Sequence, residues 1–192
     1  MQLQHVNMKL LVQNPEAVDL EVLIPIFHNW IQEQPFPEKL LDVADYRHVP
    51  EGPGVVLIGY QGDYSVDNTD NRLGIRYNRK AVLDGENDDR LRQAARATLT
   101  AAQRLEADSR LNGKLRVNGQ EMEISVNDRL LTPNTPETRE RSRPEFDAFF
   151  QKLFGGGAYS LSYASDPRRL FSVTVKAEHA YSISNLLANL NS

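Results

Sequence analysis

Hydrophobic and polar positions alternate with a period of two in several short segments of this chain, and this pattern predicts β-strands. Short strands are predicted over 6–13 and 41–47. Residues 55–60, VVLIGY, are continuously apolar, as in a strand that is buried on both faces. Two further alternating segments, AYSLSYA and LFSVTVKA, lie on either side of Asp166-Pro167 and predict a hairpin.

Apolar positions at a spacing of three or four predict helices in four other segments. Pro25 lies inside the first of them, where it either kinks the helix or marks its real start. The third begins at SRPE, which fits a capping box with Ser142 as the cap and Glu145 at the third helical position. The residues before Ser142 are expected to be a polar connector. The four segments are 17–33, 88–111, 142–153 and 180–190.

Asn118-Gly119 lies inside the alternating segment 114–126 and predicts a two-residue type I′ turn. Such a turn places Leu115 opposite Met122 on one face of a hairpin. It also pairs opposite charges on the other face, which cross-strand neighbours favour.

The charged segment 59–80, GYQGDYSVDNTDNRLGIRYNRK, predicts a second hairpin. A four-residue loop over 68–71 places Asp67 opposite Arg72 as an exposed ion pair, and Val66 opposite Leu73. A calcium loop is disfavoured because Arg72 stands where such a loop needs glycine. A P-loop and a Rossmann motif are excluded because the glycines precede or bracket a strand and offer no helix start to a phosphate.

The order of these elements predicts an α+β fold with a mainly antiparallel sheet built from hairpins, and with helices packed on one face. The second half alternates hairpins and helices in a compact pattern, so a boundary is expected near Asn112. The chain is then either an N-terminal α+β unit of residues 1–112 followed by a ββαββα unit of 113–192, or one continuous domain.

The composition narrows the chemistry. Hydrophobic residues make up 40% and charged residues 25%, and the net charge of −4 does not favour nucleic acid as a partner. The absence of cysteine excludes disulfides, Cys-based zinc sites and a thiol nucleophile. The histidines share no metal-ligand spacing, so neither a metal nor another cofactor is expected. No apolar segment reaches the ~20 residues of a membrane span, and a cytoplasmic protein is expected.

Polar residues cluster just before and at the start of the 59–80 segment, and they predict the first candidate site. The catalytic candidates are His48, Tyr60 and Asp63, which suit general acid–base chemistry if they converge in one pocket. An alternative is that His48 and Tyr60 are half-buried packing groups and that the nearby glycines are bulges. The candidate ligand-binding residues are Asp45, Tyr46, Arg47, Tyr60 and Gly62.

Arginines near the third helix and in the last hairpin predict a second candidate site, for an anion. The alternative is that these are solvated charges beside a helix start. The residues are Arg139, Arg141, Arg143, Arg168 and Arg169.

The pattern as a whole predicts a non-catalytic binding or interaction domain. Its partner is expected to be another protein or a second copy of this chain, because antiparallel sheets with open edges pair with further strands. The alternative is a small enzyme that uses His48, Tyr60 and Asp63.

Overall fold

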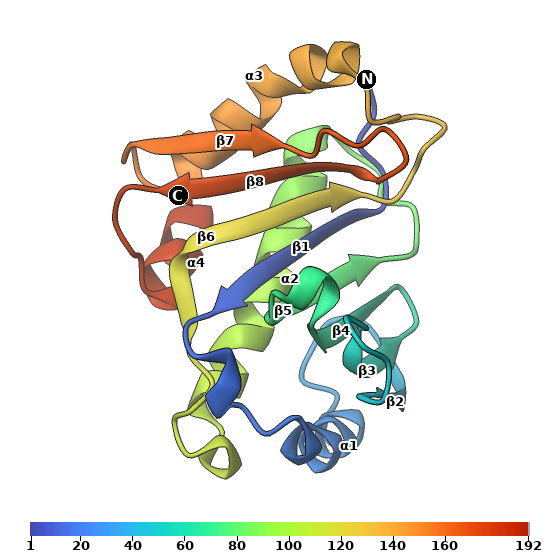
Figure 1. The fold of residues 1–192 in the computed structure, drawn as a ribbon, viewed down its shortest axis with the longest axis vertical. Helices are drawn as coiled ribbons and strands as arrows, with labels where there is room; N and C mark the ends of the chain where they lie inside the picture. Colours follow the sequence, from blue (N-terminus) through green and yellow to red (C-terminus); the bar gives the residue numbers. More distant parts are fainter. Residues whose placement is uncertain (192) are drawn as a thin grey trace.

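A computed structural model describes residues 1–191 and contains one eight-stranded antiparallel sheet against which four α-helices pack (Figure 1). The predicted α+β fold class is confirmed. The strand order is β2-β3-β4-β5-β1-β6-β8-β7. The strands are β1 (Val6–Val12), β2 (Leu40–Tyr46), β3 (Gly54–Gly59), β4 (Gly62–Asp67), β5 (Gly74–Arg79), β6 (Val117–Val126), β7 (Tyr159–Tyr163) and β8 (Phe171–Ala177). The helices are α1 (Leu23–Glu33), α2 (Asn87–Ala107), α3 (Pro136–Leu153) and α4 (Ile183–Asn191).

The strand register separates an apolar face from a polar face. Residues that are paired across the sheet share a face, and the next residue along each strand points to the other face. One row of paired residues is apolar or aromatic across seven strands: Leu57, Tyr64, Tyr77, Met8, Ile124, Val173 and Tyr163. The neighbouring row is polar across six strands: Ser65, Arg76, Lys9, Glu123, Thr174 and Ser162.

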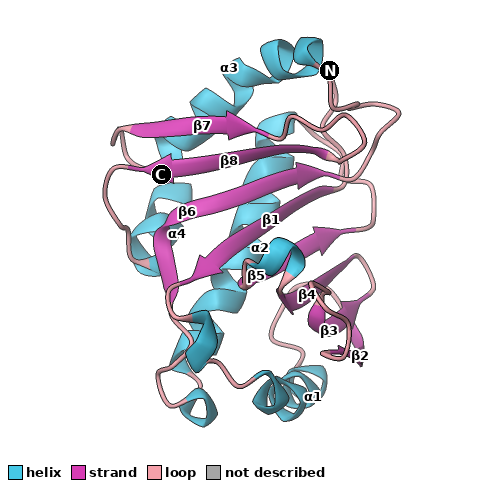
Figure 2. Cartoon of the chain, in the orientation of Figure 1, coloured by secondary structure: helices cyan, strands magenta, loops and turns pink. Residues whose placement is uncertain are grey.

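The helices cover the apolar face. Figure 2 shows α2, α3 and α4 behind the sheet, while the front carries no α-helix. The apolar stripe of α2 lies in the core, with Leu91, Leu99 and Leu105 at most 1% exposed. From α1, Trp30 packs its ring on Phe36, which stacks on Tyr64 of β4. The polar face of the sheet is called the open face below.

The sheet continues across the predicted boundary at Asn112. β1 lies between β5 and β6, and it pairs with both. A shared sheet does not test whether residues 1–112 and 113–192 can each fold alone. The division into two units therefore stays a prediction.

Two helices start at other residues than the sequence predicts. α1 begins at Leu23, so Pro25 lies in its first turn, where the missing N–H removes no helical hydrogen bond. The prediction that Ser142 caps the third helix is wrong. α3 begins at Pro136, and its cap Thr135 accepts a hydrogen bond from the Thr138 N–H. Ser142 is fully buried inside this helix, where its hydroxyl donates to the Arg139 carbonyl oxygen at 3.3 Å.

The hairpin of β4 and β5 is present, but its predicted register is wrong by two residues. Asp67 pairs with Gly74 and Val66 pairs with Ile75. A shift of two keeps every side chain on its predicted face, whereas a shift of one would have reversed the faces. The longer loop includes a short 3₁₀ turn, η3 (Thr69–Asn71).

The predicted hairpin at Asn118-Gly119 is wrong. Both residues lie within β6, which pairs with β1 on either side of a register shift: Val12 with Val117 and Leu10 with Met122. Gly119 does have the expected positive φ, of 58°. Positive φ suits a bulge as well as a turn, because both need a residue without a β-carbon.

Replacement of Gly119 by alanine is expected to lower the free energy of unfolding by about 2 kcal/mol or more. The new Cβ would lie 1.9 Å from the Tyr181 carbonyl oxygen in a backbone region that L-residues rarely adopt. Urea unfolding measures the loss. Gly113→Ala is the matched control, since Gly113 has φ of 69° but its nearest neighbour would be 3.7 Å away. Equal losses in the two variants would show that only backbone strain matters.

Candidate functional site

Lys9 lies at the centre of the open face, on the central strand β1. The register places Arg76 of β5 on one side of it and Glu123 of β6 on the other. Side chains opposite each other on an antiparallel pair have Cβ atoms roughly 5 Å apart, so the charges of Arg76 and Glu123 act electrostatically on Lys9.

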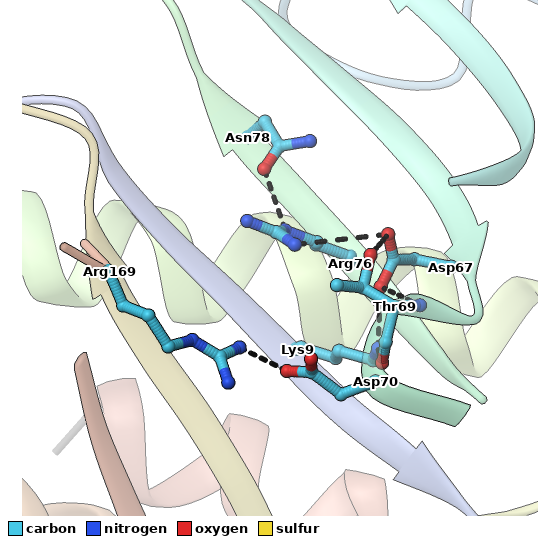
Figure 3. Close-up of polar contacts among 7 residues, drawn as sticks. All are labelled: Lys9, Asp67, Thr69, Asp70, Arg76, Asn78 and Arg169. Carbon is cyan, nitrogen blue, oxygen red and sulfur yellow. Dashed lines mark hydrogen bonds and ion pairs between the residues drawn. The ribbon is translucent and has the colours of Figure 1, made fainter. Parts of the chain in front are cut away.

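A buried ion pair joins Lys9 to the end of β4. Figure 3 shows Lys9 and Asp67 directed toward each other, with 2.5 Å between Lys9 Nζ and Asp67 Oδ1. Lys9 also donates to the Thr69 carbonyl oxygen at 3.3 Å. The exposed fractions of Lys9 and Asp67 are only 4% and 2%. The expected exposed pair of Asp67 with Arg72 is therefore wrong.

The Asp67 carboxylate has more partners. Its Oδ2 accepts from the Thr69 hydroxyl at 2.9 Å, and its Oδ1 accepts from the Thr69 N–H at 3.2 Å. Arg76 Nη1 lies 3.8 Å from Oδ2. Burial lowers the pKa of Lys9, and the neighbouring carboxylate opposes that change. The negative charge of Asp67 is thus shared between two cations.

A hollow of about 300 Å³ opens above this pair. Arg169 approaches it from the loop before β8 and forms an ion pair with Asp70 (Figure 3). Arg129 also lines it and makes no hydrogen bond or ion pair with any described residue. Five cationic side chains and two carboxylates line the hollow in total. They are Lys9, Arg76, Arg129, Arg168 and Arg169, with Asp70 and Glu123.

A second hollow, of about 680 Å³, adjoins the first along the open face. Thr69, Arg76 and Leu170 line both. Asn7 and Asn78 are paired in register within it and offer amide groups. The two hollows form a continuous polar surface with a local excess of positive charge.

The structure divides the predicted anion-binding arginines. Arg168 and Arg169 line the open-face hollow. Arg139 instead donates to the Ala164 carbonyl oxygen at 2.9 Å, and so ties α3 to the loop after β7. Arg141 and Arg143 are exposed on α3, where each lies within 4 Å of an acidic residue one turn away.

His48, Tyr60 and Asp63 are not brought together. His48 follows Tyr46, which pairs with Gly54 at the start of β3, whereas Asp63 pairs with Ile58 near the other end of that strand and Tyr60 follows that end. Gly54 and Ile58 are four residues apart, which corresponds to roughly 13 Å of strand. His48 and Tyr60 are exposed, and Asp63 forms an ion pair with Lys80 at 2.6 Å. These three residues share no common pocket, and their acid–base role stays a prediction.

The predicted ligand-binding residues are also spread out. Asp45, Tyr46 and Arg47 are exposed at the end of β2. Hydrogen bonds from the Arg47 side chain lower the pKa of Asp45 to about 2. Gly62 is buried, and a Cβ there would lie 2.5 Å from the Tyr77 hydroxyl oxygen. The room that Gly62 leaves is thus filled by Tyr77.

Several open-face residues were not identified from the sequence, namely Lys9, Arg76 and Arg129. Each is a single basic residue in a different segment, so only the pairing of β1 with β5 and β6 brings them together.

Within residues 1–191, no group of three or more His, Asp or Glu side chains is arranged to hold a metal ion. None of the helices in that range is both long and apolar enough to cross a membrane. Comparisons with known protein families and with curated proteins find no match.

Proposed function

We propose that this chain is a non-catalytic binding domain whose open face binds small anionic molecules that carry phosphate or carboxylate groups. The observation that carries this proposal is the hollow above Lys9, where five cations face two carboxylates in a protein with a net charge of −4. A basic cluster in an acidic chain is a local feature that overall composition does not explain.

The chemistry of these side chains suits an anion. Arginine presents N–H groups in a planar fork that matches the oxygens of phosphate or carboxylate. Arg129 has no described partner, so it can bind an anion without breaking an existing contact. Lys9 is already paired with Asp67, which balances its charge, so the arginines around the hollow supply the positive charge for the anion.

The size of the site favours a small molecule. Hollows of about 300 and 680 Å³ fall within the range of roughly 300–1,000 Å³ that small-molecule sites occupy. A protein partner or a second copy of this chain stays a further prediction. It is supported by the edge strand β2, where Leu41 and Tyr46 are 46% and 44% exposed.

Millimolar pyrophosphate is expected to raise the melting temperature of the wild-type protein, because a ligand that binds only the folded state stabilises it. Sodium chloride at the same ionic strength should give a smaller rise. The double variant Arg129→Gln/Arg169→Gln is expected to weaken pyrophosphate binding at least about tenfold, or about 1.4 kcal/mol. Titration calorimetry measures that loss.

Arg141→Gln/Arg143→Gln is the matched control. It also removes two positive charges, but it removes them from α3 instead of from the open face. It should bind pyrophosphate like the wild type. If both double variants lose affinity equally, the effect comes from net charge and the proposed site is wrong.

A further inference from the structure

The strand β7 lies at one edge of the sheet. Within the part of the chain that the structure describes, its strand neighbour is β8 on one side (Figure 1). Just after β7, the Ala164 N–H donates to the Ser172 carbonyl oxygen at 3.2 Å and so points toward β8. Alternate residues of an antiparallel strand direct their backbone groups to opposite sides. The N–H and C=O groups of Tyr159, Leu161 and Tyr163 therefore point away from the sheet, as a row that a further strand can pair with.

The two edges of the sheet differ in how open they are. At the other edge, β2 carries Asp42 and Asp45, and the Asp42 carboxylate accepts from the Val43 N–H at 2.8 Å. The Gln34 side chain also binds both backbone groups of Leu40, at 2.9 and 3.0 Å. Charges and occupied backbone groups oppose the addition of a strand. The sequence of β7, Tyr-Ser-Leu-Ser-Tyr, contains neither a charge nor a proline, so this edge is the more open one.

The sequence of β7 fits a second copy of itself, because it reads the same in both directions. Two antiparallel copies related by a two-fold axis at Leu161 place Tyr159 of one opposite Tyr163 of the other. Ser160 then lies opposite Ser162. The outward backbone groups of the tyrosines and the leucine meet the same groups of the second copy. Each residue lies opposite its own type, and no charge meets a like charge.

The flank of α3 beside this edge carries charges that favour the same arrangement. The Tyr159 hydroxyl donates to the Asp147 carbonyl oxygen at 3.0 Å, so Asp147 lies near the start of β7. Arg139 binds the Ala164 carbonyl oxygen, so the first half of α3 lies near the end of β7. Arg143 lies between them, with its side chain 70% exposed. A two-fold axis at the middle of β7 brings the arginines of one copy toward Asp147 of the other.

We propose that two copies of this chain associate through β7, as an antiparallel pair centred on Leu161. The pairing joins the two sheets into one, with both open faces on the same side and the two α3 helices on the other. The side chains of Tyr159, Leu161 and Tyr163 are half-buried in one copy, and the second copy covers more of their apolar area. This association does not depend on the binding of an anion.

Sedimentation equilibrium tests the proposal. The wild-type protein is expected to be a dimer at about 100 µM and to dissociate on dilution, because association follows mass action. Ser160 and Ser162 are exposed, and Ser160 is paired with Lys176 in its own sheet. Ser160→Glu/Ser162→Glu places glutamate opposite glutamate across the axis, and it should weaken dimerisation at least about tenfold.

Ser160→Glu/Ser162→Lys is the matched control, because it changes the same two positions but places glutamate opposite lysine. It should dimerise like the wild type. Leu161→Pro is the second variant if the first does not fold. It removes an N–H that points away from β8, so it should weaken the dimer without breaking the pairing of β7 with β8.

Three results would overturn the proposal. The first is a wild-type protein that stays monomeric at the same concentration. The second is a Glu/Glu variant that dimerises like the wild type, which would show that the copies meet elsewhere. The third is equal loss of the dimer in the Glu/Glu and Glu/Lys variants, which would exclude the register centred on Leu161.

Discussion

Replacement of Phe150 by alanine is expected to lower the free energy of unfolding by about 3–5 kcal/mol. Phe150 is fully buried, and its ring centroid lies 5.1 Å from that of Phe149 and 5.9 Å from those of Phe154 and Tyr159. The loss has two causes, since apolar area is no longer buried and the well-packed neighbours cannot fill the cavity. Urea or thermal unfolding measures it.

Tyr60→Ala is the control for this prediction. Tyr60 is 73% exposed, so its removal should change stability by no more than about 0.5 kcal/mol. Domains of ordinary stability have only about 5–15 kcal/mol in reserve, so Phe150→Ala should be close to unfolding at physiological temperature. A Phe150→Ala variant that unfolds like Tyr60→Ala would show that α3 does not pack on the sheet.

Replacement of Asp67 by alanine is expected to cost about 3–5 kcal/mol, because it leaves the buried Lys9 charge without its partner. The pH dependence should change as well. Burial already lowers the pKa of Lys9 below its ordinary value of 10.5, and the Asp67 carboxylate limits that change. Without Asp67 the pKa of folded Lys9 falls further. Between this pKa and 10.5 the unfolded state binds more protons, so the stability of the variant should rise with pH across that interval.

Asp63→Ala is the matched control for Asp67. Asp63 also forms an ion pair, with Lys80, but the Lys80 side chain is 43% exposed. An exposed pair is worth no more than about 1 kcal/mol. The double variant Lys9→Met/Asp67→Leu should recover much of the stability, because no buried charge remains. Equal losses for Asp63→Ala and Asp67→Ala would contradict the burial of the Lys9 pair.

Local features of the sequence were sufficient to predict most elements of secondary structure. The alternation in LFSVTVKA predicted β8, and the pairing of β7 with β8 around Asp166-Pro167 is as expected. The helical spacing of apolar residues predicted the helix over 142–153, and Phe146, Phe149 and Phe150 form its buried face. These predictions hold because periodicity, turn residues and burial on one face act over a few neighbouring residues.

Local features were less reliable for the exact bounds and partners of the elements. Gly119 was correctly expected to need positive φ, yet the same property serves a bulge in β6 instead of a turn. The hairpin of β4 and β5 kept its predicted faces with a register shifted by two residues, since both registers place Val66 in the core. Alternation with a period of two cannot distinguish such registers.

The sequence by itself determined the fold class, the amphipathic faces and the existence of the β4–β5 and β7–β8 hairpins. Only the tertiary structure decided the candidate sites. Lys9 on β1 and Asp67 on β4 are 58 residues apart and meet because β5 pairs with both strands in the sheet. The position of β7 at an edge follows from the strand order, which the alternation within this strand does not reveal. The physical reason is that burial and charge pairing depend on long-range contacts, which no short sequence pattern encodes.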